Sequence, residues 1–399
     1  MSIRDLLPAE AAGTFLGRLR VPGCRAPVPI LVTGNAVHDV SDIDPTISGI
    51  LETQDLPRRL DEVRTRPADW AVDDISTPAE AAPADSHAEP TPPAAPESAD
   101  APVLLAPIDL QVIKACGVTF AGSMVERLIE ERCDGDPARA QSVREELAEA
   151  VTADLSAIVP GSAEAARLKE ALIAKGWWSQ YLEVGIGPDP EVFTKGPVLS
   201  AVGSGDAVGI PAFSQWSNPE PELVLIVDSA GAIRGVTMGN DVNLRDVEGR
   251  SALLLGMAKD NNRSTAIGPL IRLFDEEFGL EDARSLELRL TVTGDDGSEL
   301  TGINSVGSLS RRFEELVSAA HGRHHQYPDG FVLFTGTLFA PTEDRDAVGL
   351  GFTHHLGDVV TIANDRLGAL RNTVGRCEDL PAWDYGIRAL FADIGAGQR

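Results

Sequence analysis

Two neighbouring apolar runs near the middle of the chain carry carboxylates at one end, which limits how they can fold. Residues 223–227 are predicted to form a strand, with Glu220 and Glu222 at its start. Side chains two positions apart on an extended chain point to the same side, so these two carboxylates share one face. Residues 233–238 are predicted to form the next strand, which delivers Asp241 just past its end. The pattern predicts two adjacent strands that gather three carboxylates.

Three carboxylates from two strands suit a hard divalent cation. Mg²⁺ takes oxygen ligands and keeps open positions for water or a substrate. Glu220, Glu222 and Asp241 are therefore the predicted metal ligands. The alternative is a solvated acidic surface, because acidic residues are mostly exposed and a Glu-x-Glu pair alone is weakly specific.

The composition of one segment divides the chain. Residues 77–103 contain seven prolines, many alanines and scattered acids. Such a segment has too little apolar surface to fold alone, so it is predicted to be a linker. Residues 1–76 are predicted to form a small β-rich N-terminal domain, and residues 104–399 the main domain that carries the carboxylates.

Periodicity predicts the elements on either side of the linker. Two strands that meet at a tight turn near Gly34 are expected in the first domain. From residue 180 onward, short runs of Val, Ile and Leu alternate with Gly, Pro and Asp, which is typical of β structure. Helices are expected at 45–55, 56–66, 123–132, 136–157, 162–175 and 308–319.

The charge balance excludes several classes of partner. The chain has 61 acidic and 34 basic residues and a net charge of −27, whereas nucleic-acid-binding proteins need basic patches. No nucleic-acid partner and no membrane partner are expected. No apolar run approaches the roughly 20 residues that cross a bilayer, and the N-terminus lacks the features of a signal peptide. A cytoplasmic protein is therefore expected, with four free cysteines because none forms a C-x-x-C pair.

Several short blocks of sequence follow one another in a specific order. Glu220-Pro-Glu222-Leu fits the pattern E-x-E-L, and Asn240-Asp241-Val-Asn-Leu-Arg245-Asp is close to N-D-x-S-x-R-D. The further blocks are Phe193-Thr-Lys195-Gly-Pro, Gly203-Ser-Gly-Asp206, Lys259 with Gly268-Pro269, Asp329-Gly-Phe331, Gly336-Thr337, Gly357-Asp358 and Gly368-Ala-Leu-Arg-Asn372. Together they resemble the fumarylacetoacetate hydrolase superfamily, over roughly residues 106–399.

The resemblance implies an α+β fold, with a mixed β-roll core wrapped by helices and a Mg²⁺ or Mn²⁺ ion on the three carboxylates. It implies that Lys259 is the active-site lysine, and the metal and Arg245 are expected to lower its pKa by like charge. It also implies that Lys195 and Thr337 bind the carboxylate of a substrate. Glu191 shares a strand face with Lys195 and is expected either to transfer a proton or to pair with that lysine.

Two departures from the family pattern indicate a branch. Hydrolase and decarboxylase members carry an N-Y-x-x-H-x-x-E segment whose His and Glu activate a water. Here Ser123 occupies the histidine position, while Glu126 is retained. A serine with no adjacent base cannot take a proton from water near neutral pH. Glu248 stands where those members commonly have Gln. Both departures resemble the branch of 2-keto-3-deoxypentonate dehydratases.

This branch implies a Mg²⁺-dependent hydro-lyase that converts 2-keto-3-deoxy-D-xylonate to 2,5-dioxopentanoate in non-phosphorylating pentose breakdown. Lys259 is expected to remove the C3 proton, and Glu126 or Glu191 to protonate the departing C4 hydroxyl. The other residues expected to contact this small-molecule acid are Ser123, Arg245, Glu248 and His325. A homodimer or homotetramer is expected.

Alternatives stay open at this point. One is an acylpyruvate or β-diketone C–C hydrolase or an oxaloacetate-type decarboxylase, which Ser123 disfavours. Another is a non-catalytic binding homologue, which the presence of Lys259 and all three metal carboxylates disfavours. Arg245 and Glu248 could also brace their loop as an ion pair. The stereochemistry and chain length of the substrate are not determined by the sequence.

Overall fold

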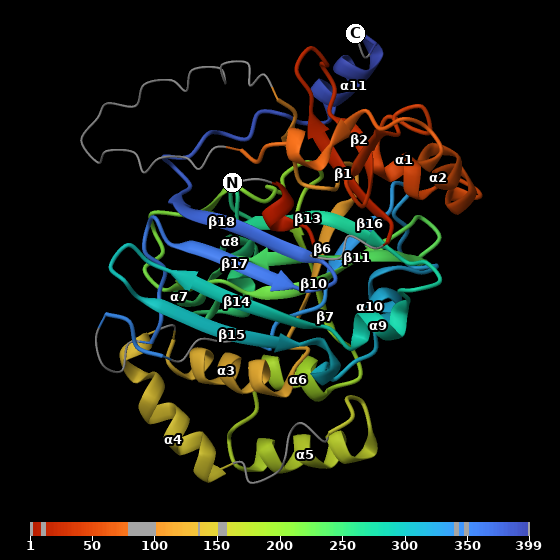
Figure 1. The fold of residues 1–399 in the computed structure, drawn as a ribbon. Helices are drawn as coiled ribbons and strands as arrows, with labels where there is room; N and C mark the ends of the chain where they lie inside the picture. Colours follow the sequence, from red (N-terminus) through yellow and green to blue (C-terminus); the bar gives the residue numbers. More distant parts are fainter. Residues whose placement is uncertain are drawn as a thin grey trace.

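The computed structural model of the protein describes residues 3–8, 13–78, 101–134, 136–150, 158–338, 343–346 and 351–397. The fold is α+β, as predicted. A large sheet and a smaller five-stranded sheet pack face to face, and helices cover the two ends of this core (Figure 1).

The large sheet runs through most of the chain. Its strands lie in the order β4-β3-β2-β1-β13-β11-β10-β16-β6-β7, and β5 also pairs with β1. In that order the strands are Trp70–Ala71, Ala36–Asp39, Val28–Thr33, Phe15–Arg20, Thr265–Leu273, Ile233–Asp241, Pro221–Val227, Phe331–Phe334, Val112–Gly117 and Glu191–Gly196, with β5 at Val103–Leu104. Neighbouring strands are antiparallel except β16 and β6, which are parallel.

The smaller sheet has the order β15-β14-β17-β18-β8 and lies in front of the large sheet in Figure 1. Its strands are Glu299–Ser305, Glu287–Thr293, Val359–Asn364, Gly368–Arg376 and Ala207–Ile210. A two-stranded ladder joins β12 (Asn243–Leu244) to β9 (Ser217–Asn218). The region after residue 180 is therefore rich in β structure, as predicted.

The strand β10 lies at the centre of the core and is buried on both faces. Leu223 and Leu225 pack in one apolar cluster together with side chains of the smaller sheet. Val224 and Ile226 pack in a second cluster, together with the helices near the N-terminus. A strand that is covered on both faces needs a continuous apolar run instead of an alternating one. This is why residues 223–227 are apolar without a break.

Helices gather at both ends of the core. Helices α3–α6 lie at one end, and α1 and α2 lie beside the first strands at the other (Figure 1). The helices are α1 Ile47–Leu51, α2 Leu56–Arg64, α3 Ala121–Arg132, α4 Ala140–Ala150, α5 Ala163–Ala174, α6 Gln180–Ile186, α7 Arg245–Glu248, α8 Leu255–Lys259, α9 Leu280–Arg284, α10 Phe313–Ala320 and α11 Ile387–Gly395. Short 3-10 turns occur at Ile3–Leu6, Val72–Asp74, Pro137–Arg139, Ala252–Leu254 and Val306–Ser308.

The predicted helices are confirmed wherever the structure describes them, with one later start. The helix expected at 308–319 begins at Phe313, because two residues before it bond to other segments of the chain. Ser310 donates its backbone N–H to Thr119 at 2.8 Å, and Arg311 donates to the carbonyl of Gly187 at 2.8 Å. The helix expected at 136–157 is a 3-10 turn followed by α4, and residues 151–157 lie outside the described residues.

The N-terminal strands extend the large sheet. As predicted, β2 and β3 are antiparallel and meet at Gly34, whose positive φ of 57° suits glycine. Strand β1 pairs with β13 through Phe15 and Leu16. The domain boundaries stay a prediction, because residues 79–100 of the expected linker lie outside the described residues. Within the part that is described, no helix is long and apolar enough to cross a membrane.

Candidate active site

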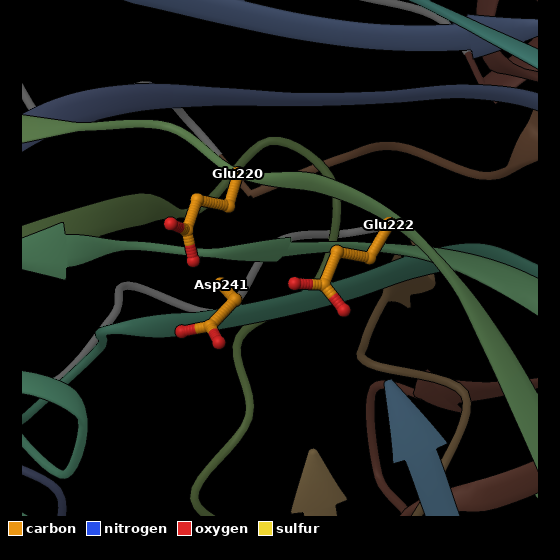
Figure 2. Close-up of side chains that lie close together, drawn as sticks. All are labelled: Glu220, Glu222 and Asp241. Carbon is orange, nitrogen blue, oxygen red and sulfur yellow. The ribbon is translucent and has the colours of Figure 1, made fainter. Parts of the chain in front are cut away.

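The three predicted metal ligands come together. Glu220 precedes β10, Glu222 lies in it, and Asp241 is the last residue of β11. The antiparallel pairing of the two strands aligns them, and the backbone N–H of Asp241 donates to the carbonyl of Glu220 at 3.0 Å. One oxygen of each carboxylate lies within 4.8 Å of the others. Figure 2 shows the three side chains turned toward a common space, and all three are buried.

Cationic side chains of the protein surround these carboxylates. The Nζ of Lys259 lies 2.5 Å from Glu220 Oε2 and 3.2 Å from Asp241 Oδ2. The Nζ of Lys195 lies 3.1 Å from Asp241 Oδ1. Arg127 donates a hydrogen bond to Glu220. The protein's own side chains therefore balance part of the buried negative charge.

The charged form of Glu222 is disfavoured in this arrangement. Its carboxylate accepts the backbone N–H of Gly336 at 2.6 Å. Burial raises the pKa of Glu222 well above its ordinary value, and the charges of Asp241 and Glu220 raise it further. A cation among the three carboxylates would relieve both effects. The donor set, which consists of carboxylate oxygens alone, fits a hard divalent ion such as Mg²⁺ or Mn²⁺.

A small cavity lies beside the carboxylates. Its volume is about 20 Å³, which is enough for about one water molecule. The lining residues are Cys116, Gly117, Val118, Ser123, Arg127, Phe193, Glu220, Glu222, Asp241, Glu248, Lys259, Gly336 and Thr337. This volume is smaller than an organic acid, so binding of such a ligand requires part of the lining to move. Three of the residues that are predicted to contact a substrate line this cavity, namely Ser123, Glu248 and Thr337.

The expected lowering of the Lys259 pKa is wrong for this arrangement. Burial of the amine lowers its pKa, but the charges of Asp241, Glu220 and Glu248 outweigh burial and raise the pKa above its ordinary value. Arg245, which was expected to repel it, instead bonds to Glu130 at 2.6 Å. Lys259 is therefore an ammonium ion while its carboxylate neighbours carry their charge.

The helix α3 supplies two residues that the sequence analysis did not identify. Arg127 pairs with Glu130 at 2.7 Å and with Glu248 at 3.0 Å, besides its bond to Glu220. Glu130 in turn bonds to the guanidinium of Arg245, which stacks on the ring of Trp216. The spacing of Ser123, Arg127 and Glu130, at i, i+4 and i+7, was the available signal, because it puts them on one helix face.

Opposing effects act on the pKa of Glu248, a carboxyl in the cavity lining. It ends the short helix α7, and its main-chain oxygen accepts the hydroxyl of Tyr181 at 3.1 Å. Burial raises the pKa of Glu248 to about 7, and Glu220 and Glu130 add to that effect. The positive charges of Arg127 and Lys259 act in the opposite direction. Both protonation states of this carboxyl are therefore accessible near neutral pH.

Two predicted residues support the site from outside its cavity. Glu126 pairs with Arg144 at 2.7 Å and lies 3.7 Å from Arg245. Neither Glu126 nor Arg245 lines the cavity. Three residues along α3 from Ser123, Glu126 turns toward α4, which carries Arg144. Glu126 therefore lies outside the cavity in this structure, and its expected role as a proton donor stays a prediction.

Lys195 and Glu191 lie behind the cavity wall. Lys195 is fully buried and donates to the backbone oxygen of Lys259 and to both oxygens of Ser264, at 3.0 and 3.1 Å. These contacts, with Asp241, occupy its ammonium group, and Lys195 does not line the cavity. Its expected contact with a substrate stays a prediction. Glu191 packs over Gly117, where an added Cβ would meet its Oε2 at 2.0 Å. Gly117 lines the cavity, whereas Glu191 does not.

His325, an expected substrate contact, also lies away from the cavity. Its side chain is exposed, and its ring lies 4.5 Å from the ring of Tyr327, with the two planes tilted by 45°. It does not line the cavity. The strand β16, which follows this loop, brings Gly336 and Thr337 to the site instead, because it pairs with β10.

The buried ion pairs of α3 give a stability prediction. Glu130→Ala is expected to lower the free energy of unfolding by about 3–5 kcal/mol, because it leaves Arg127 and Arg245 buried without a shared partner. Urea unfolding measures the change. In Glu183→Ala, which breaks an exposed pair with Lys169, the loss should be at most about 1 kcal/mol. Equal losses in the two variants would contradict the importance of the buried network.

Comparison with known proteins finds a family model that matches the part of the chain carrying the three carboxylates. Residues 179–375 match the family model described as fumarylacetoacetate (FAA) hydrolase C-terminal. A probable 2-keto-3-deoxyxylonate dehydratase of Haloferax volcanii is 34% identical over 194 residues, which cover 49% of this chain and 63% of that protein. A 2-dehydro-3-deoxy-D-arabinonate dehydratase of Saccharolobus solfataricus is 33% identical over 156 residues, 39% of this chain and 51% of that protein. Each match thus spans less than two thirds of the relative's length.

Solved structures are similar in fold. The structure of 2-keto-3-deoxy-D-arabinonate dehydratase complexed with magnesium and 2,5-dioxopentanoate has a TM-score of 0.59 at 20% identity, and covers 91% of this chain and 99% of that one. A fumarylacetoacetate hydrolase from Exiguobacterium antarcticum has a TM-score of 0.51 at 16% identity, and covers 91% of this chain and 100% of that one. The fold is thus of the fumarylacetoacetate hydrolase type, as the sequence blocks predict. Residues 179–375, which carry the three carboxylates, Glu248 and Lys259, match the model of the fumarylacetoacetate hydrolase family.

Proposed function

We propose that this chain is a Mg²⁺-dependent dehydratase that converts 2-keto-3-deoxy-D-pentonate to 2,5-dioxopentanoate and water. One observation carries the proposal: a buried set of three carboxylates shares one cavity with Glu248 and Lys259, while Ser123 stands where a water-activating histidine would be. The names of the two curated relatives support the same class of reaction.

The names xylonate and arabinonate describe one substrate here. D-Xylonate and D-arabinonate differ in configuration at C2 and C3. A ketone at C2 and a methylene at C3 remove both stereocentres, so their 2-keto-3-deoxy derivatives are the same molecule. The remaining specificity concerns the configuration at C4 and the length of the chain.

The proposed metal ligands are Glu220, Glu222 and Asp241. A bound Mg²⁺ or Mn²⁺ ion would draw electron density from the ketone of the substrate and so acidify the C3–H bond. Ser123 and Thr337 are the neutral polar side chains of the lining, and they offer hydrogen bonds that orient the acid.

Lys259 is the proposed proton acceptor at C3. The charges that raise its pKa belong to Asp241, Glu220 and Glu248. The first two are proposed metal ligands, so a cation that shared their charge would weaken this effect and leave burial to lower the pKa of the amine. Loss of the C3 proton and of the C4 hydroxyl gives an unsaturated keto acid. Transfer of a C5 proton to C3, and ketonisation of the resulting enol, then give the aldehyde at C5.

The hydrolase and decarboxylase alternatives are less well supported. The hydroxyl of Ser123 donates to the carbonyl of Phe120 at 2.9 Å. Glu126, the carboxylate that pairs with the histidine in hydrolase members, is here paired with Arg144. No pair that activates water is therefore assembled at this position. A non-catalytic homologue would not need to keep the buried carboxylates, Lys259 and Glu248 around one cavity.

An assay with a panel of substrates tests the proposal. Purified protein is mixed with 2-keto-3-deoxy acids of five and six carbons, with D or L configuration at C4, in the presence or absence of Mg²⁺. The product is followed by NMR, and acylpyruvates serve as controls. We expect Mg²⁺-dependent formation of 2,5-dioxopentanoate from the five-carbon D acid. Faster cleavage of acylpyruvates, or no dehydration of any acid, would contradict the proposal.

The position of Ser123 gives a further prediction. Ser123→His is expected to remain a poor hydrolase overall but to gain weak cleavage of acylpyruvates, because an imidazole in place of this lining residue would add a base for water to the cavity. The gain is measured as kcat/KM for an acylpyruvate relative to the unchanged protein. Ser123→Asn, which adds volume without a base, should show no gain. Equal activity of both variants would contradict this explanation of the branch.

Assembly and location are also proposed. We infer that the chain acts in the cytoplasm as a homodimer or homotetramer. The exposed apolar side chains of Ile387 and Phe391 on α11, and of Trp383 before it, support self-association. Light scattering at several protein concentrations tests this, and a monomer at every concentration would contradict it.

A further inference from the structure

Elimination of the C4 hydroxyl needs a proton donor, because hydroxide is a poor leaving group at neutral pH. Neither residue predicted for this task, Glu126 or Glu191, lines the cavity. We propose that Glu248 is the catalytic residue that delivers the proton to the departing C4 hydroxyl, and that Arg127 is the positioning residue that holds its carboxyl in the cavity. This inference rests on the proposed dehydratase function.

The placement of Glu248 suits a donor. It is 4% exposed and lines the same cavity as the three carboxylates and Lys259. Its carboxylate lies 3.0 Å from the guanidinium of Arg127, and its main-chain oxygen accepts the Tyr181 hydroxyl at 3.1 Å. Side chain and backbone are therefore anchored from different helices, α3 and α6. A donor that is held in place loses little entropy when a substrate arrives.

Arg127 is itself held in place. It bonds to Glu130 at 2.7 Å, and Glu130 bonds to Arg245 at 2.6 Å. Burial raises the pKa of Glu130, but the charges of Arg127 and Arg245 outweigh burial and lower it. This carboxyl therefore stays ionised and pairs with both arginines. Arg127 also reaches Glu220, one of the proposed metal ligands. It thus links the proposed metal site and the proposed donor through one guanidinium.

The environment of Glu248 allows it to carry a proton. Burial, Glu220 and Glu130 raise its pKa to about 7, against the opposing charges of Arg127 and Lys259. A donor works best when its pKa lies near the working pH. The carboxyl can therefore give up a proton during elimination and regain one in each cycle.

The proton balance of the reaction closes with these groups. Lys259 takes the C3 proton, and the electron pair of that bond first gives an enolate of the C2 ketone. The enolate then forms the C3–C4 double bond as the C4–O bond breaks. Glu248 gives its proton to the departing oxygen, which leaves as water, and the remaining carboxylate faces Arg127. The Glu248 carboxylate then takes a proton from C5, and Lys259 returns its proton to C3. Both groups regain their starting states, and no other reactant is needed.

The test compares two variants of α7. Glu248→Gln keeps the size of the side chain but cannot donate a carboxyl proton. Asp246→Asn removes a carboxylate two residues away, which bonds to Ser214 at 2.7 Å and lies outside the cavity. Glu248→Gln is expected to lower kcat for 2-keto-3-deoxy-D-pentonate by about 10²–10⁴-fold. Asp246→Asn should stay close to the unchanged protein, and Mg²⁺ binding by calorimetry should be similar in all three.

Two further readouts separate proton delivery from a structural role. Exchange of the C3 proton with deuterated solvent should persist in Glu248→Gln, because Lys259 is intact. An analogue with fluoride at C4 loses its leaving group without protonation, so Glu248→Gln should release fluoride at nearly the rate of the unchanged protein. Arg127→Lys should lower kcat for the natural acid in the same direction and spare fluoride release.

The outcomes are distinct. Normal dehydration by Glu248→Gln, or loss of fluoride release in parallel with dehydration, would overturn the role of Glu248. If the unchanged protein neither exchanges the C3 proton nor dehydrates any keto-deoxy acid, the dehydratase function itself fails. Exchange and dehydration by the unchanged protein, with an unaffected Glu248→Gln variant, would sink this inference alone.

Discussion

Glu222→Ala should abolish Mg²⁺-dependent turnover while leaving the fold intact. This carboxylate is one of the three in the proposed metal site, and one of its oxygens accepts the backbone N–H of Gly336. Loss of a metal ligand removes several kcal/mol of charge stabilisation, and each 1.4 kcal/mol is about a factor of ten. The kcat is therefore expected to fall by about 10³-fold or more. Calorimetric titration should also show much weaker Mg²⁺ binding.

A matched control lies at the other end of the same strand. Asp228 follows β10 and accepts the backbone N–H groups of Ala230 and Ala232 at 3.0 and 2.8 Å. Asp228→Asn keeps an acceptor and should bind Mg²⁺ normally. Glu222→Ala is not expected to lose thermal stability in the absence of metal, since it removes a buried carboxyl whose pKa is raised by burial. Unchanged dependence of activity on Mg²⁺ in Glu222→Ala would show that the ligands are misassigned.

Lys259→Arg should lower kcat by about 10²–10⁴-fold, the scale of a lost acid–base group. Arginine keeps the positive charge beside Glu220 and Asp241 but does not lose its proton at neutral pH. Binding of the substrate, measured by titration with Mg²⁺ present, should change far less. Exchange of the C3 proton with deuterated solvent should disappear together with turnover.

The control for this variant is Lys114→Arg. Lys114 lies on β6 and bonds to Thr194 at 3.0 Å, away from the cavity. It tests whether a Lys-to-Arg change by itself disturbs the large sheet. If Lys259→Arg exchanged the C3 proton normally and only bound the acid more weakly, the lysine would be a binding group. The search for the base would then move to Glu191, which lies behind Gly117.

The sequence predicts the centre of this site because its geometry is local. Alternation along a strand places Glu220 and Glu222 on one side, and the antiparallel neighbour brings Asp241 beside them. The short helix α8 then brings Lys259 back to the same carboxylates. These relations depend on short stretches of chain, so strand periodicity and known sequence blocks are enough to find them.

The second half of the site depends on packing that no local pattern specifies. Arg127 and Glu130 reach the carboxylates because α3 docks against α7 with one particular face. The orientation of α3 about its own axis places Arg127 in the cavity lining and Glu126 beside Arg144. Lys195 fits the motif but is enclosed by the carbonyls of Lys259 and Ser264. Burial by residues distant in sequence therefore decides which charged groups face a ligand.

The pairing of β1 with β13 gives the first part of the chain a protective role. Strand β13 lies next to β11, and β11 ends in Asp241. Phe15 and Leu16 cover part of the other edge of β13. A chain that began after residue 76 would leave this edge open, with unpaired N–H and C=O groups that invite association with other chains. The first strands thus protect the sheet that carries the site from aggregation. Only β13 separates β1 from β11, the strand that ends in Asp241.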